Sequence, residues 1–293
     1  MSEPCIALTI QSHVAWGHVG NSAAVLPLQL LGVEAIAVHT VQFSNHTGYG
    51  EFKGQVFPAS HIRDVLDGLD ARGVLARCDA VLSGYLGDAG TGEVILDAVS
   101  AIRQVNPGLR YVCDPVMGDV GRGMFVRPGI PEFLRHRALP HCDVLTPNQF
   151  EFEFLAGEPI GASVAHAVAV ARKLLRAQAT APGPEMIVIT SLRTDDMPAD
   201  RIATLAVNHA EAWSVQTPHL ACEPPPSGMG DVFAATLTGR LLRGEPVAQA
   251  LSHTVSCLYG LVSHLAPGAR DLPLVAARSQ ITDPDTEFDA VAV

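Results

Sequence analysis

Lysine is almost absent from this sequence of 293 residues, which contains only Lys53 and Lys173. Asp and Glu together number 30 against 19 Lys and Arg, so the formal net charge is −11. A nucleic-acid-binding surface needs basic residues to neutralise phosphates, so this composition argues against a nucleic-acid partner. Any phosphate that the protein binds must be held by arginine, by backbone N–H groups or by a bound cation.

Several motifs are also missing. The six cysteines include no C-x-x-C pair and the twelve histidines no H-E-x-x-H, so the sequence favours structural thiols over zinc ligands or disulfides. No G-x-x-x-x-G-K-[ST] occurs, and the glycine-rich stretch 118–123 does not match G-x-G-x-x-G. The N-terminus has no basic region, and the apolar run at 6–10 is too short for a signal or a membrane span. We therefore expect a cytoplasmic protein with no membrane partner.

The residues that are present predict a large buried core, because 48% are hydrophobic and 17% are charged. Short apolar segments alternate with longer amphipathic ones, which indicates an α/β fold with a mostly parallel central sheet and helices on both faces. We expect strands at 5–10, 35–40, 80–83, 110–113, 144–146 and 186–190, followed by an antiparallel pair at 202–207 and 212–215. The expected helices are 21–31, 60–71, 90–105, 149–156, 163–179, 231–243 and 247–265.

We expect one domain over residues 1–293, because no linker divides the chain. Residues 41–56 interrupt the alternation and are predicted to form a small flap that projects from the sheet. Residues 266–293 carry Asp283, Asp285, Glu287 and Asp289 with little core material, which favours loose order in this C-terminal tail.

A candidate phosphate site lies at residues 228–231, where Gly228, Met229, Gly230 and Asp231 open a helical run. Two glycines let successive N–H groups converge, and the helix adds the positive end of its dipole. An acid inside an anion site makes sense if Asp231 takes a proton from a hydroxyl that attacks phosphorus. The alternative is an ordinary helix start with a stabilising first-turn acid, and this segment alone leaves both open.

Two further polar groups follow predicted strands, where ligands bind in doubly wound sheets. Asp114 and Asp119 come directly after the strand at 110–113, and paired carboxylates suit a hard cation. Asn148 and Glu151 begin the helix after the strand at 144–146. They suit magnesium and its waters, although an ordinary helix cap is the commoner reason for such residues.

The first predicted strand runs into a third polar group, Ser12 and His13, followed by Trp16 and His18. A dinucleotide-binding protein would carry its glycine fingerprint here, and this sequence does not. A hydroxyl, two imidazoles and an indole suit a small polar aromatic ligand instead. A buried His18 bonded to the backbone is the alternative for that residue.

Taken together, these segments resemble the pyridoxal kinases (pyridoxine kinase family) of the ribokinase superfamily. The matching blocks are 12–14, 17–24, 41–49, 83–87, 113–119, the N-x-x-E element 148–151 and the G-x-G-D element 228–231. They occur in order and span nearly the whole chain. The 41–49 block is specific to pyridoxal kinases, whereas N-x-x-E and G-x-G-D are shared across the superfamily. The resemblance implies a three-layer ribokinase-like fold, a homodimer, and ATP-dependent phosphorylation of the 5′-hydroxymethyl group of pyridoxal, with pyridoxine and pyridoxamine as further candidate substrates.

The resemblance also implies roles for individual residues. Asp231 would be the base, and the amides of Gly228, Met229 and Gly230 would form the anion hole. Ser12 would hydrogen-bond the pyridine ring. The remaining substrate contacts would be Val19, Phe43, His46, Thr47, Gly48 and Tyr85. The ATP-binding set would be Asp114, Thr146, Asn148, Glu151, Thr190, Gly228 and Gly230. Mg²⁺ would be organised by Asp114, Asp119 and Glu151, and the family also raises the prospect of a monovalent cation.

Two positions depart from the family pattern. Met229 stands where a smaller residue is more common, and its side chain could narrow the pocket. Thr190 stands where some bacterial relatives carry lysine, which argues against a direct lysine–phosphate contact. Two rival functions are a hydroxymethylpyrimidine kinase and a non-catalytic vitamin B6 sensor. The intact Asp231 argues against the sensor, because a sensor has no need of a base.

Overall fold

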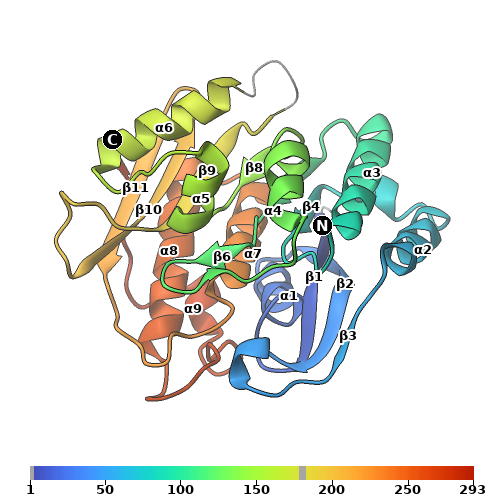
Figure 1. The fold of residues 1–293 in the computed structure, drawn as a ribbon, viewed down its shortest axis with the longest axis horizontal. Coiled ribbons are helices and arrows are strands. Elements are labelled where there is room, and N and C mark those ends of the chain that lie inside the picture. Colours follow the sequence, from blue (N-terminus) through green and yellow to red (C-terminus); the bar gives the residue numbers. More distant parts are fainter. Residues whose placement is uncertain (1–2, 178–182) are drawn as a thin grey trace.

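A ten-stranded sheet forms the centre of the molecule, with the strand order β12-β11-β10-β9-β8-β5-β4-β1-β2-β3. The structure is a computed structural model that describes residues 3–177 and 183–293. Every neighbouring pair from β9 to β2 is parallel, whereas β3 at one edge and β10, β11 and β12 at the other pair antiparallel. The mostly parallel sheet of the predicted α/β fold is therefore confirmed (Figure 1).

The strands of the main sheet are β1 (Ile6–Trp16), β2 (Glu34–Asn45), β3 (Gly54–Val56), β4 (Ala80–Ser83), β5 (Arg110–Cys113), β8 (Val144–Leu145), β9 (Met186–Leu192), β10 (Arg201–Asn208), β11 (Ala212–Pro218) and β12 (Val291–Ala292). A separate small hairpin is formed by β6 (Gly118–Asp119) and β7 (Gly123–Met124). The helices are α1 (Asn21–Leu30), α2 (Ala59–Asp70), α3 (Ala89–Val105), α4 (Ile130–Phe133), α5 (Gln149–Ala156), α6 (Val164–Ala177), α7 (Met229–Leu242), α8 (Val247–Ser263) and α9 (Ser279–Thr282). The last two residues of the helix predicted at 163–179 lie outside the described residues.

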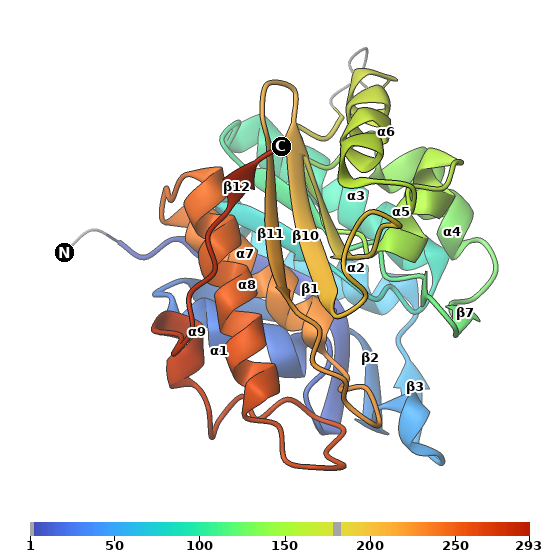
Figure 2. The same cartoon turned by 90° about the vertical axis from the view of Figure 1, so that its left-hand side faces the viewer.

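Helices cover both faces of the sheet, and two separate hydrophobic clusters fill the layers. Alternate residues of a strand point to opposite faces, so Ile6, Leu8 and Ile10 join the cluster under α2, α3, α4, α5 and α6. Ala7, between them, joins the cluster under α1, α7 and α8. Figure 2 shows α7 and α8 packed on one side of the strands and α3, α5 and α6 on the other. The three-layer arrangement matches the sequence prediction.

The first two strands are longer than the sequence indicated. β1 continues through Trp16 and β2 through Asn45, because the two strands keep pairing beyond the apolar residues. The strand predicted at 5–10 was therefore too short, since Ser12 and His13 both lie on β1. The pairing register shifts between Gln11 and His13. Such a bulge re-aims side chains locally, and here it lies beside Ser12.

The predicted flap at 41–56 is the extension of this sheet edge. β2 runs out to Asn45, a short 3-10 helix η1 (Thr47–Tyr49) turns the chain, and β3 returns antiparallel to β2. Its tip lies at the lower end of the molecule in both views (Figures 1 and 2). The flap therefore ends beside the carboxyl end of β1.

The C-terminal tail packs on the domain, although its acidic composition favoured loose order. Two serines of α8 accept hydrogen bonds from tail backbone, Ser256 from Phe288 N–H and Ser252 from Ala290 N–H, both at 2.8 Å. Leu272 and Leu274 are fully buried in a third cluster with residues of α1, α7 and α8. Composition alone missed these contacts because a few apolar tail residues, Leu272, Leu274, Ala277 and Ile281, are enough to anchor the segment. Within residues 3–177 and 183–293, no helix is long and apolar enough to cross a membrane.

Candidate functional site

The candidate site lies at the carboxyl ends of β1 and β4, where the topology of the sheet reverses direction. From β1 the chain passes through α1 to β2 on one side, whereas β4, β5, β8 and β9 follow in order on the other side. The helices α1 and α3 that begin these two progressions cover opposite faces of the sheet. A crevice forms at such a switch point and is the usual ligand site of an open α/β sheet.

The N-terminus of α7 points into this region. Gly228 is the N-cap residue and has a left-handed φ of 84°, which a glycine adopts without strain. The first N–H groups of a helix have no partner within the helix, and Gly230 is exposed, so these amides can reach a bound anion. The side chain of Met229 packs against the third hydrophobic cluster. The expectation that the Met229 side chain narrows the pocket stays a prediction.

Asp231 lies in the first turn of α7 and contacts the turn after β1. Its carboxylate accepts hydrogen bonds from the backbone N–H groups of Gly20 and of Asp231 itself, which lower its pKa, but burial outweighs them and the pKa is raised. Gly20 in turn lies so close to Ser12 that a methyl group on Gly20 would overlap the Ser12 carbonyl and hydroxyl oxygens. The predicted base and the predicted ring-binding hydroxyl are thus neighbours of the same glycine.

Asp114 faces the same helix end from the carboxyl end of β5. A methyl group placed on Gly230 would lie 3.8 Å from Asp114 Oδ2. Asp114 is only 5% exposed, and the Thr146 hydroxyl donates to its Oδ1 at 3.4 Å. Burial raises the pKa of Asp114 well above its ordinary value, and the charges of Glu151 and Asp231 raise it further. The raised pKa shows that a negative charge on Asp114 is unfavourable beside Glu151 and Asp231. A bound cation would offset this repulsion, so the three carboxylates favour a cation at the site.

Glu151 is committed to backbone hydrogen bonds. Its Oε1 accepts from Met117 N–H at 2.8 Å and Gly118 N–H at 3.4 Å, and its Oε2 accepts from Asn148 N–H at 2.9 Å. Asn148 Oδ1 accepts from Glu151 N–H, which completes a capping box, and Asn148 Nδ2 donates to Gly118 O at 2.8 Å. Burial nevertheless raises the pKa of Glu151 to about 7. The helix-cap alternative for these residues is thus realised, and the same bonds fix the loop that carries Asp114 and Asp119.

The predicted magnesium residues do not form a three-ligand cluster. Among the described residues, no group of three or more His, Cys, Asp or Glu side chains is arranged to hold a metal ion. Asp119 is exposed on β6, and its Oδ1 accepts from Val120 N–H at 2.7 Å. Mg²⁺ at kinase sites usually keeps several waters and takes only one or two carboxylates besides substrate phosphates. The residues present fit an ion of that kind, with Asp114 as the buried carboxylate that faces the α7 N-terminus from the end of β5.

The remaining nucleotide candidates lie at the ends of β8 and β9. Thr146 is 3% exposed and follows β8 directly. Thr190 pairs with Asn148 through an isolated parallel bridge, and its N–H donates to Pro147 O at 2.9 Å. The structure therefore brings Asp114, Thr146, Asn148, Glu151 and Thr190 together near the carboxyl ends of β5, β8 and β9, and Asp114 faces the α7 N-terminus.

The substrate candidates approach from the other side, through the flap and the end of β4. His46 precedes η1, and its Nδ1 accepts from Gly48 N–H at 3.3 Å. Thr47 and Gly48 are exposed on η1, and Tyr85 follows β4, where its carbonyl accepts from the Thr40 hydroxyl at 2.7 Å.

Two substrate candidates and one neighbour are less directly placed. Val19 is 8% exposed and lies next to Gly20. The Phe43 ring packs on Phe52 within the flap at 4.9 Å, which ties it to the flap itself. His18 Nδ1 is buried with no hydrogen-bond partner among the described residues, so the backbone does not satisfy this ring nitrogen.

Sequence reasoning missed several residues of this region. Gly20 gave no signal because its role depends on contacts with Ser12 and Asp231 across the fold. Arg122, on the loop between β6 and β7, lies beside the flap, where its charge lowers the pKa of His46. Arg270 and Asp271 lie in the tail, and no local pattern distinguishes them.

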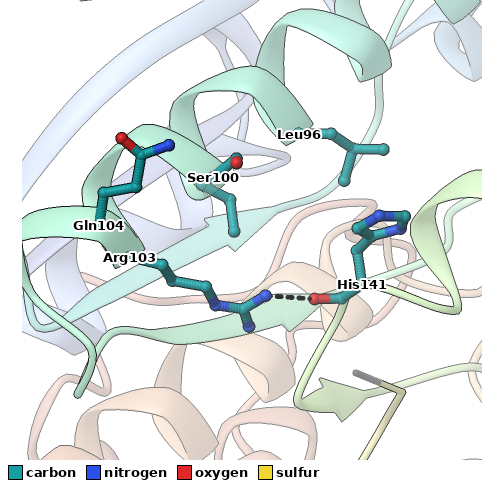
Figure 3. A pocket seen from close by; sticks show the side chains of 6 residues that line it. Leu96, Ser100, Arg103, Gln104 and His141 are labelled. Carbon is teal, nitrogen blue, oxygen red and sulfur yellow. Dashed lines mark hydrogen bonds between the residues drawn. The ribbon is translucent and has the colours of Figure 1, made fainter. Parts of the chain in front are cut away.

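A second hollow lies elsewhere and does not belong to this site. It is bordered by α3 and His141, where Arg103 donates to His141 O at 3.0 Å and to Asp143 at 2.7 Å (Figure 3). Asp143 immediately precedes β8, so this hollow is at the amino ends of the strands.

Comparisons with known proteins agree with this geometry. The sequence profile of the phosphomethylpyrimidine kinase family matches residues 23–274. The pyridoxal kinase PdxY of Rubrobacter xylanophilus is 51% identical over 96% of this chain and 95% of its own length, and that of Deinococcus radiodurans is 48% identical over 98% and 96%. The pyridoxal kinase of Leishmania donovani, solved with ADP and pyridoxamine, is 28% identical with a TM-score of 0.88, covering 98% of this chain and 99% of that one.

Proposed function

This chain belongs to the phosphomethylpyrimidine kinase family, and from that premise we propose that it is a pyridoxal kinase that transfers the terminal phosphate of ATP to the 5′-hydroxymethyl group of pyridoxal. The observation that carries the proposal is the N-terminus of α7, where Asp231 contacts Gly20 beside Ser12 while Gly230 faces Asp114. The ring side and the phosphate side of a transfer reaction thus meet at one helix end.

Asp231 acts as the base. It lies between the ring side and the anion side, where a hydroxymethyl group would attack phosphorus. Burial raises its pKa, and a more basic carboxylate accepts a proton from a hydroxyl more readily. The hydrogen bond from Gly20 N–H keeps the carboxylate oriented while it does so.

The amides of Gly228, Met229 and Gly230 stabilise the charge on the transferring phosphoryl group. Backbone donors fixed by a helix need no reorganisation during the reaction, and the helix dipole adds positive potential. Asp114, Thr146, Asn148, Glu151 and Thr190 position the nucleotide opposite them. Bound Mg²⁺ would supply positive charge between the phosphates and the Asp114 carboxylate, with Asp119 and Glu151 acting through water. A monovalent cation stays a prediction from the family resemblance.

The ring of the substrate would lie between β1 and the flap. Ser12 donates to or accepts from the pyridine ring, and Val19, Phe43 and Tyr85 border its apolar faces. His46, Thr47 and Gly48 close the pocket from the flap. This arrangement is supported by the bulge at Ser12 and by the position of η1 at the carboxyl end of β1.

Hydroxymethylpyrimidine is the second candidate substrate, because the matching family profile bears the name of a phosphomethylpyrimidine kinase. It presents the same hydroxymethyl group on a similar ring. The relatives of 51% and 48% identity favour pyridoxal. A non-catalytic vitamin B6 sensor is disfavoured, since Asp231 and both glycines are present at the start of α7 and a sensor has no need of a base.

Assays with purified protein test the proposal. With pyridoxal, ATP and magnesium, ADP and pyridoxal 5′-phosphate should form in equal amounts, and pyridoxine and pyridoxamine extend the same panel. Absence of both products would overturn the proposal. We also propose a homodimer with the flap at the contact, which sedimentation tests, and a cytoplasmic location, which cell fractionation tests. Trp16 at the end of β1 and Phe52 within the flap are exposed and support that contact.

A further inference from the structure

Four segments that are far apart in the sequence meet at Asp271. They are the turn after β1, the flap helix η1, the loop that leads into α7, and the tail segment after α8. Figures 1 and 2 show the flap and the tail segment at the same lower end of the molecule. We call the contacts of His18, Tyr49, Ser227, Arg270 and Asp271 the Asp271 junction.

The first contact of the junction fixes the turn after β1. Asp271 Oδ1 accepts a hydrogen bond from His18 N–H at 2.9 Å, across 253 positions of sequence. Gly17 has a φ of 101°, and a methyl group there would stand 2.6 Å from the same oxygen. Only glycine at position 17 lets the carboxylate approach this closely. The turn that is held here continues directly into Val19 and Gly20 of the site.

The second contact fixes the flap. The Tyr49 hydroxyl donates to Arg270 O at 3.1 Å, and Arg270 Nη1 donates to Gly48 O at the same distance. The Arg270 guanidinium also lies over the Tyr49 ring, 5.4 Å from its centre. Burial and the neighbouring Asp271 carboxylate raise the pKa of Tyr49 to about 12, so its hydroxyl keeps the proton it donates to Arg270 O.

The third contact fixes the loop before α7. Ser227 N–H donates to Arg270 O at 2.8 Å, and Ser227 pairs with Asp271 in a parallel bridge. The Ser227 hydroxyl lies 3.4 Å from His46 Nδ1 and so joins this loop to the flap. Gly228, the next residue, is the cap of the anion site.

The junction rests on a rigid base. Leu272 and Leu274 follow Asp271 and are 1% and 0% exposed, in a cluster with Ala23 of α1, Val232 of α7 and Leu261 of α8. Helices α1 and α7, which frame the site, therefore also fix the position of Asp271. Movement of the junction would require movement of this core.

We propose that Asp271 is a positioning residue that holds the flap and the turn after β1 in register with the phosphate-binding helix. It does not touch the reacting atoms and acts through His18, Tyr49 and Ser227. The inference rests on the proposed function for its kinetic consequence, because these three residues border the ring side of the site. The nucleotide side is held separately by Asn148 and Glu151.

The kinetic test compares the change in KM for pyridoxal with the change in KM for ATP. Asp271→Ala removes the acceptor of the His18 N–H hydrogen bond and the carboxylate beside Tyr49, and a charged hydrogen bond of this kind corresponds to a change of about 10-fold or more. KM for pyridoxal should rise by about 10-fold, with KM for ATP changing by less than about 2-fold. Asp271→Asn keeps one acceptor oxygen for His18 N–H and should recover part of the loss. Asp283→Ala, an exposed acid of the same tail, is the matched control and should leave all constants unchanged.

A second measurement does not depend on catalysis. Hydrogen–deuterium exchange of the Gly48 and Tyr49 amides should accelerate in Asp271→Ala and in the milder Tyr49→Phe, and not in Asp283→Ala. If the wild type phosphorylates no pyridoxal but exchange accelerates, the proposed function fails and the junction stands. If the wild type is active and neither the pyridoxal KM nor the exchange rates change, the junction is wrong. If Asp271→Ala does not fold, the KM for pyridoxal and the amide exchange rates of Tyr49→Phe test the junction instead.

Discussion

The carbonyl oxygen of His18 lies directly against Gly228, so close that a methyl group on Gly228 would overlap it. Gly228 also has a left-handed φ of 84°. Gly228→Ala should therefore displace the turn after β1 or the start of α7. Loss of one donor to a transferring group costs about 10²–10³ in kcat, and we expect at least that loss here. Steady-state kinetics with pyridoxal and ATP measures it.

Gly244→Ala is the control for this variant. Gly244 has a φ of 78°, and nothing lies within 4 Å of the position that a methyl group would take. Gly244→Ala therefore introduces the same backbone strain as Gly228→Ala, about 1–2 kcal/mol, but its methyl group overlaps no other atom. Equal kcat losses in the two variants would contradict the role of Gly228, whereas normal kcat in Gly244→Ala supports it.

Asp231→Asn tests the base. Asparagine keeps the size of the side chain and an acceptor for Gly20 N–H, but it cannot accept the substrate proton. A positioned base contributes about 10²–10⁴ in rate, so kcat should fall by that factor while KM for ATP changes little. Asp64→Asn on the exposed side of α2 should retain full activity. An Asp231→Asn enzyme with normal kcat would place the proton acceptor elsewhere.

Asn148→Ala tests the nucleotide side of the site. The variant removes the cap of α5 and the bond to Gly118 O, which should reduce the free energy of unfolding by about 1 kcal/mol and raise KM for ATP. Asn208→Ala removes comparable turn bonds, since Asn208 Oδ1 accepts from Ala210 N–H and Glu211 N–H far from the site. Urea unfolding and ATP titrations should show similar stability losses in both variants and a changed KM only for Asn148→Ala. A normal KM for ATP in Asn148→Ala would contradict the assignment.

The sequence predicted the elements whose signals are local. Helix α5 was predicted at 149–156 and found at Gln149–Ala156, because Asn148 and Glu151 form its cap and Gly157 ends it in a left-handed conformation. The start of α7 and the positions of Asp114 and Asp119 after β5 were also predicted from local signals in the sequence. The outer half of β1 was missed because polar residues from Ser12 to Trp16 are held in the strand by pairing with β2. Asp271 was missed because its partner His18 lies 253 positions away.

A stacked histidine pair makes stability depend on pH. The rings of His13 and His39 lie 4.2 Å apart and nearly parallel, and burial lowers the pKa of both below 6.5, with the charge of His13 further lowering that of His39. The unfolded chain therefore takes up protons first as pH falls. The free energy of unfolding should decrease as pH falls below 6.5, by up to about 1.4 kcal/mol per pH unit for each histidine.

The double variant His13→Asn/His39→Asn checks this dependence. Its melting temperature should fall less than that of the wild type between pH 7 and pH 5. The exposed His209→Asn variant should keep the wild-type slope. If the melting temperatures of the double variant and the wild type fall equally between pH 7 and pH 5, groups other than these two histidines control the loss of stability in acid.

The most direct test of the account compares kcat/KM for pyridoxal and hydroxymethylpyrimidine in competition, with ATP and magnesium at saturation. In the proposed function the bulge at Ser12, the flap and the Asp271 junction border the pyridine ring, and single pocket contacts discriminate by about 10-fold or more. We predict that pyridoxal is preferred by at least this factor, with pyridoxal 5′-phosphate as the product. A preference for hydroxymethylpyrimidine, or no phosphorylation of pyridoxal, would contradict the account.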